Sequence, residues 1–83
     1  MRTKEEIEHF IGFCQIAGDK FAAKIVNILA DMSERELQSF RQTLNSCIAD
    51  KKACLLVDGT EQITLRGKQR IVVLNILNWL ENV

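Results

Sequence analysis

The sequence contains no proline and no tyrosine, and it has only four glycines, one tryptophan and one histidine among 83 residues. Proline removes a backbone N–H donor and clashes with the preceding helical turn, so its absence leaves few positions where a helix must break. With 47% hydrophobic and 27% charged residues, the chain can bury a core, and its composition argues against intrinsic disorder. We expect residues 1–83 to form a single helical domain.

Long apolar runs are also missing. The run from Ile71 to Leu74 ends at Asn75, and no run reaches the 18 residues of a membrane-spanning helix. Acidic residues, Glu5 and Glu6, stand where a signal peptide needs an apolar segment. The three cysteines form no CxxC pair, which argues against a disulfide framework. The sequence therefore predicts a soluble cytoplasmic chain with no membrane partner.

The chain has no excess of either charge, since 11 basic residues face 11 acidic ones. Proteins that bind nucleic acids usually carry a basic surplus, so nucleic acid is a disfavoured partner. An uncharged protein has little electrostatic self-repulsion, which favours association. The expected partner is another protein, a second copy of the chain in a homodimer, or both.

Apolar residues recur at helical spacing through the first half of the chain. This periodicity predicts three amphipathic helices, over residues 4–17, about 20–31 and 33–52. In the first helix, Phe13 and Ile16 widen an inward stripe that includes Ile7, Phe10 and Cys14. All three helices are therefore expected to turn an apolar face toward a common core.

Local signals mark the helix ends. Thr3 and Ser33 each precede a glutamate by three residues, the capping-box pattern that opens a helix. Gly18 suits the left-handed residue that ends the first helix, and Asp19 suits the cap of the second.

A β-hairpin is predicted next. The apolar run 54–57 is followed by Asp58-Gly59, which suits a two-residue turn, and then by residues 60–64. A frayed helix end followed by a loop is the alternative. Thr64 is then expected to cap a last helix over residues 65–81. The fold class is mainly α: a small bundle of about four helices with a short β-hairpin before the last helix.

The last helix has an apolar arc over about half its circumference, wider than an ordinary core-facing stripe. The arc contains Leu65, Val72, Val73, Ile76, Leu77, Trp79, Leu80 and Val83. Such a helix is central in the fold or part of an interface. We expect the segment 65–83 to contribute to a homodimer contact.

No residue pattern indicates catalysis or metal binding. The single histidine, His9, lies one helical turn from Glu5, which indicates a surface pair. Cys14 and Cys47 fall on apolar stripes and Cys54 begins an apolar run, so reduced structural cysteines are expected. We predict no enzyme activity, no cofactor and no metal.

One segment suggests a family. Residues 53–70 combine a short strand, a turn, a second strand and a helix start with Ile63, Thr64, Gly67 and Lys68. This fifth of the chain resembles the wing and following helix of winged helix-turn-helix domains. The resemblance implies a DNA-binding regulator in which Arg66, Lys68 and Arg70 contact phosphates. A recognition helix should precede the wing after a turn, whereas residues 33–52 have the pattern of one continuous helix. A plain structural hairpin is the favoured interpretation.

These observations favour a small non-enzymatic module for protein–protein interaction. A stand-alone chain of this size suits a bacterial or phage accessory, regulatory or inhibitor protein that acts by binding a surface. Interfaces draw their energy from aromatic and aliphatic anchors. The candidate partner-binding residues are Trp79, Leu80, Ile76, Val83 and Leu74. The alternative is the winged-helix-like DNA-binding transcriptional regulator.

Overall fold

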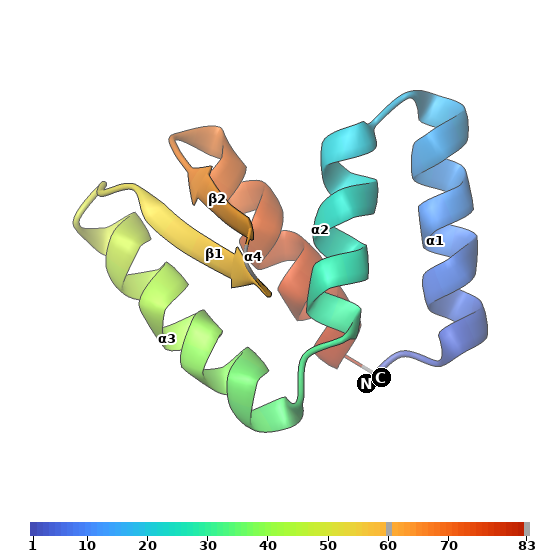
Figure 1. The fold of residues 1–83 in the computed structure, drawn as a ribbon, viewed down its shortest axis with the longest axis horizontal. Helices are drawn as coiled ribbons and strands as arrows, with labels where there is room; N and C mark the ends of the chain where they lie inside the picture. The colour runs from blue at the N-terminus through green and yellow to red at the C-terminus, as the bar shows by residue number, and fades with distance from the viewer. Residues whose placement is uncertain (60, 83) are drawn as a thin grey trace.

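A computed structural model describes residues 1–59 and 61–82, and it contains four helices and one hairpin. The elements are α1 (Lys4–Ala17), α2 (Lys20–Ala30), α3 (Glu34–Ala49), β1 (Cys54–Asp58), β2 (Glu61–Leu65) and α4 (Lys68–Glu81). Helices α1 and α2 lie antiparallel on one side, α3 and the hairpin lie on the other, and α4 passes behind (Figure 1). The predicted fold class is confirmed.

One core joins these elements. Helix α4 packs against both α2 and α3, while α1 packs mainly on α2. Every element contributes to the core, whose fully buried large side chains include Ile25, Leu29, Leu37, Leu44, Leu56, Leu65, Leu77 and Leu80. Among the described residues, no helix combines the length and the apolar character that a membrane span requires.

The predicted caps of the first three helices are confirmed. The Glu6 backbone N–H donates to Thr3 Oγ1 over 3.2 Å, and the Glu6 carboxylate accepts the Thr3 backbone N–H over 3.2 Å. Ser33 and Glu36 form the same reciprocal pair. These bonds satisfy backbone donors that have no partner inside the helix. Gly18 adopts the left-handed conformation, with φ 76°, and ends α1.

Helix α3 ends at Ala49, earlier than the predicted residue 52. Lys51 adopts the left-handed conformation, with φ 57°, and the Lys52 N–H donates to Cys47 O over 2.8 Å. A second bond runs from the Lys51 N–H to Ile48 O over 3.2 Å. This pair of bonds is the Schellman arrangement that terminates helices, usually with glycine at the left-handed position. Because lysine rather than glycine occupies that position here, this helix end carries no residue signal for a stop.

The last helix begins at Lys68, and the prediction of a start at Leu65 with Thr64 as the cap is wrong. Both residues belong to β2, where Thr64 faces Leu55 and Leu65 faces Cys54. Full burial of a leucine side chain contributes about 2 kcal/mol, whereas a helix cap contributes about 1 kcal/mol. Leu65 is fully buried, so the longer strand is favoured and Gly67 occupies the cap position.

The hairpin is confirmed, with its turn shifted by one residue. Asp58 pairs with Glu61 at the end of the ladder, so Asp58 belongs to β1 and the connection begins at Gly59 rather than at Asp58. Gly59 has the positive φ, 57°, that the predicted turn requires. Thr60, the predicted first residue of the second strand, lies outside the described residues.

Candidate interaction surface

The predicted anchors in the C-terminal half of α4 are mostly internal. Ile76 is 6% exposed and Leu80 is fully buried, because α4 passes between α2 and α3. Leu74 is partly buried and packs against the same core. Val83 lies outside the described residues. Ile76 and Leu80 therefore mainly hold the chain's own elements together, although Ile76 also lines a groove between α1 and α4.

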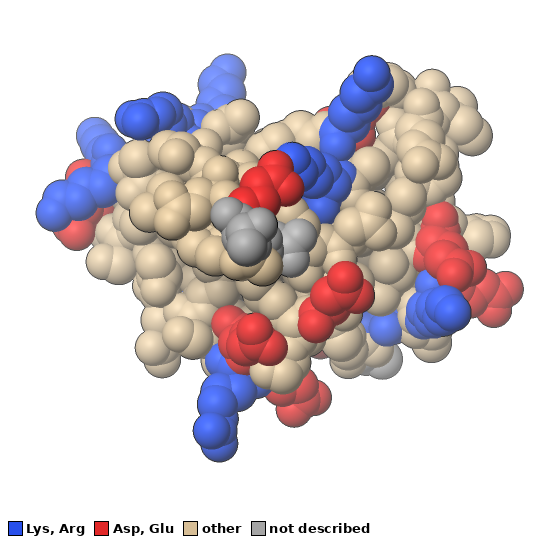
Figure 2. All heavy atoms as spheres, in the orientation of Figure 1, with Lys and Arg blue, Asp and Glu red and all other residues tan. Residues whose placement is uncertain are grey.

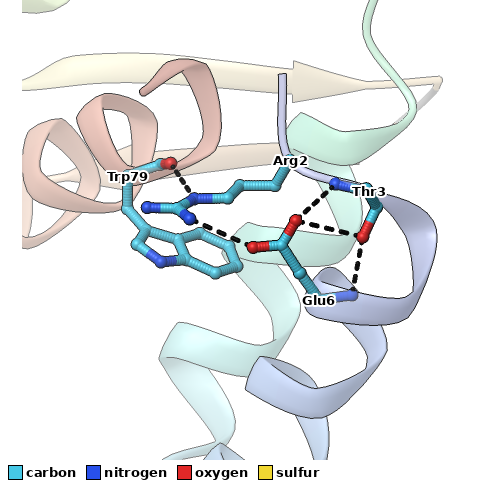
Figure 3. Close-up of polar contacts among 4 residues, drawn as sticks. All are labelled: Arg2, Thr3, Glu6 and Trp79. Atoms are coloured by element: carbon cyan, nitrogen blue, oxygen red, sulfur yellow. Dashed lines mark hydrogen bonds and ion pairs between the residues drawn. The ribbon is translucent and has the colours of Figure 1, made fainter. Parts of the chain in front are cut away.

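Trp79 is partly buried under the N-terminal segment of the same chain (Figure 3). Its ring centroid lies 4.7 Å from that of Phe10, at an interplanar angle of 31°. The Arg2 guanidinium carbon lies 5.1 Å from the ring centroid, within the range of a cation–π interaction. The Arg2 Nε also donates to the Trp79 carbonyl oxygen over 2.9 Å. Trp79 thus fastens the two ends of the chain together.

The same cluster extends into the first helical turn. The Arg2 backbone N–H donates to Leu80 O over 2.8 Å, and its guanidinium pairs with the Glu6 carboxylate over 3.0 Å. The hydrogen bond from the Thr3 backbone N–H lowers the pKa of Glu6 below its ordinary value, and the bond from Arg2 lowers it further. The carboxylate therefore serves both the cap of α1 and the contact between the chain ends.

The most exposed large apolar side chains lie on α1. Phe13 is 71% exposed and Ile16 is 90% exposed, although the sequence pattern placed both on the inward stripe. Phe13 lines a groove of about 270 Å³ together with Ala17 and with Val72 of α4, which is itself 38% exposed. We call Phe13, Ile16 and Val72 the apolar patch. It remains exposed because α1 packs mainly on α2, and α4 meets α1 across the groove rather than over these side chains.

A second pair of exposed apolar residues lies on β1. Leu55 and Val57 are about half exposed and line a groove of about 440 Å³ between β1 and α3. Arg35, Glu36 and Ser39 line the same groove, so its surface mixes apolar and charged groups. It is therefore less suited than the apolar patch to a dry protein contact.

The three cations implied by the winged-helix resemblance have different environments. Arg66 and Lys68 are exposed, on either side of Gly67. Arg70 is partly buried, and one of its guanidinium nitrogens donates to Cys47 O and to Lys52 O, each over 2.6 Å. Its Nε donates to Gly67 O over 3.3 Å. Arg70 therefore caps the C-terminal end of α3, a role that the sequence pattern did not indicate.

The residues considered for chemistry are dispersed. His9 is exposed, and it forms no ion pair with Glu5 in the part of the chain that the structure describes. All three cysteines are free thiols, with Cys14 and Cys54 buried. Burial raises the pKa of Cys54 to about 11, with a further contribution from the neighbouring Cys47 thiol. Within residues 1–59 and 61–82, no three potential metal ligands converge.

Comparisons with protein-family models, with curated proteins and with solved structures gave no match to this chain. The function must therefore be argued from the surface itself.

Proposed function

We propose that this protein is a small non-enzymatic interaction module that pairs with a second copy of itself through the apolar patch. The observation that carries the proposal is the exposure of Ile16 and Phe13, one helical turn apart on α1, a helix that packs mainly on α2. Exposing two large apolar side chains side by side costs free energy that association would recover. A module of this kind would act as an accessory or regulatory protein.

A second copy fits the patch for a geometric reason. In a two-fold contact, the same surface meets itself, so a protruding group on each copy must find a recess on the other. Phe13 and Ile16 protrude from α1, and the groove lined by Val72 lies directly beside them. Each copy can therefore place an α1 side chain in its partner's groove. Zero net charge adds little repulsion between the copies.

This surface differs from the one expected from the sequence. The N-terminal part of α4 contributes through Val72, whereas Trp79 and Leu80 are engaged within the chain. The proposal is non-enzymatic because the candidate nucleophiles are poorly suited to reaction: burial raises the pKa of Cys14 and of Cys54. The exposed His9 has no carboxylate to orient it among the described residues.

A matched pair of variants tests the proposal. Phe13→Ser/Ile16→Ser removes the apolar side chains of α1 from the patch, and Leu55→Ser/Val57→Ser removes two exposed apolar side chains from β1. Size-exclusion chromatography should show a dimer for the natural protein and for the β1 variant, and a folded monomer for the α1 variant. A dimer that survives the α1 changes, or dissociates with the β1 changes, would place the interface elsewhere and overturn the proposal.

A further inference from the structure

The zero net charge hides an uneven distribution of charge along the chain. The segments 50–52 and 66–70, on either side of the hairpin, together hold five basic residues and one acidic residue, Asp50, a surplus of four positive charges. The five basic residues are Lys51, Lys52, Arg66, Lys68 and Arg70. The two acidic residues between these segments, Asp58 and Glu61, are paired at the far end of the hairpin ladder, where Glu61 forms an ion pair with Lys24. No acidic residue occurs between positions 62 and 80. Figure 2 shows blue side chains gathered at the left-hand end of the molecule, where α3 ends and α4 begins.

Arg70 brings the two basic segments together in space. Its guanidinium bonds both to Lys52 O, over 2.6 Å, and to Gly67 O, over 3.3 Å. Lys52 and Gly67 therefore lie within reach of one side chain, although 15 positions separate them in the sequence. Arg66 and Lys68 flank Gly67, so their backbones lie close to that of Lys52.

The remaining four cations point outward. We call Lys51, Lys52, Arg66 and Lys68 the basic end; all four are exposed. The ion pairs among the described residues involve Arg2, Lys24 and Arg41, and none of them involves the basic end. The start of α4 has no side-chain cap and no acidic residue in its first turn, which adds partial positive charge.

We infer that the basic end binds the phosphate backbone of a nucleic-acid duplex, a function beyond self-association. Lysine and arginine side chains only donate hydrogen bonds, and phosphodiester oxygens only accept them. A single strand would need aromatic side chains on which its bases could stack. The chain's aromatic residues are Phe10, Phe13, Phe21, Phe40 and Trp79, none of which belongs to the segment 50–70. A duplex, whose backbone presents regularly spaced phosphates, is therefore the ligand that suits this surface.

The proposed site is not the set of residues implied by the winged-helix resemblance. The Arg70 guanidinium donates to carbonyl oxygens at the C-terminal end of α3, so it holds the two basic segments together and does not itself contact phosphate. In the proposed site, Lys51 and Lys52 contact phosphates in place of Arg70. Both residues precede the segment 53–70 that carries the resemblance. The expectation that nucleic acid is disfavoured rested on the zero net charge and on acidic residues scattered over the helices. At the basic end the charge is segregated, and no acidic residue occurs between positions 62 and 80.

The size of the effect follows from counterion release. Four phosphate contacts give a slope of about −3.6 for the logarithm of affinity against the logarithm of salt concentration, so affinity falls about 150-fold between about 50 and 200 mM salt. The slope is the direct signature of backbone contacts, because an apolar contact does not weaken as salt is added.

Fluorescence anisotropy with a labelled mixed-sequence DNA duplex tests the inference. Lys52→Glu/Lys68→Glu changes two residues of the basic end, and Lys4→Glu/Lys20→Glu makes the same change of charge at two exposed lysines elsewhere. The basic-end variant should bind at least about tenfold more weakly than the control variant at low salt. The slope of its logarithm of affinity against the logarithm of salt concentration should become less negative by about 2. Circular dichroism should show that both variants keep the natural helix content.

Four results would overturn the inference. They are no binding to the duplex at low salt, equal losses in the two variants, tighter binding to the single strand, and equally tight binding to poly-glutamate. The last would identify an acidic protein segment as the partner instead. None of these depends on dimerisation, so failure here leaves the proposed self-association standing.

Discussion

Removal of the Arg70 guanidinium should destabilise the protein, because this group closes the C-terminal end of α3. In Arg70→Met the aliphatic stem is kept, while the bonds to Cys47 O and Lys52 O are lost. A hydrogen bond that involves a charged group contributes about 1.5–3 kcal/mol. Because Arg70 is only partly buried, we use the low end of that range for each bond. The expected loss in the free energy of unfolding is about 3 kcal/mol for the two bonds together.

Urea denaturation measures this loss as a lower midpoint at an unchanged slope. Arg66→Met is the matched control, since Arg66 is exposed and its side chain makes no hydrogen bond among the described residues. Its expected effect is within about 0.5 kcal/mol. Equal stabilities for the two variants would refute the assignment of Arg70 as the cap of α3.

Other predictions concern the helix ends and the thiols. Lys51→Gly should raise the free energy of unfolding by about 0.5–1 kcal/mol in thermal denaturation, because glycine adopts the left-handed conformation without strain. The cap bonds lower the pKa values of Glu6 and Glu36 in the folded state. The stability that these carboxylates contribute is therefore fully present above the pKa of the unfolded state, and it is lost as the pH falls through the pKa of the folded state. The melting temperature of the natural protein should therefore decrease when the pH is lowered below about 4.3. The decrease should be smaller in Glu6→Gln, which lacks one of the two carboxylates. Cys14 and Cys54 should react with a thiol reagent slowly in the folded protein and rapidly in denaturant, because both are buried; fast labelling of the folded protein would contradict the structural role.

The sequence predicted those features that depend on neighbouring residues. The caps at Thr3 and Ser33 need only a glutamate three positions on, so their signals are local and both were found. The hairpin followed from a short apolar run and a glycine that tolerates positive φ. Helix ends set by a residue in an unusual conformation, such as Lys51, leave no such signal.

Features that depend on distant parts of the chain were missed. Periodicity showed that Phe13 and Ile16 lie on the apolar side of a helix, but it does not show which helices cover them, and α1 packs mainly on α2. Trp79 was expected at an interface, whereas Arg2, 77 positions away, covers it. The basic end is assembled by Arg70 across two segments, so counting charges over the whole chain could not reveal it.

Self-association through the apolar patch is the central claim, and sedimentation equilibrium of the natural protein tests it most directly. The chain mass is 9.5 kDa. The average mass should rise toward twice that value as the concentration increases into the high micromolar range, following a single monomer–dimer equilibrium. A mass that stays at the monomer value across the whole range would contradict the claim.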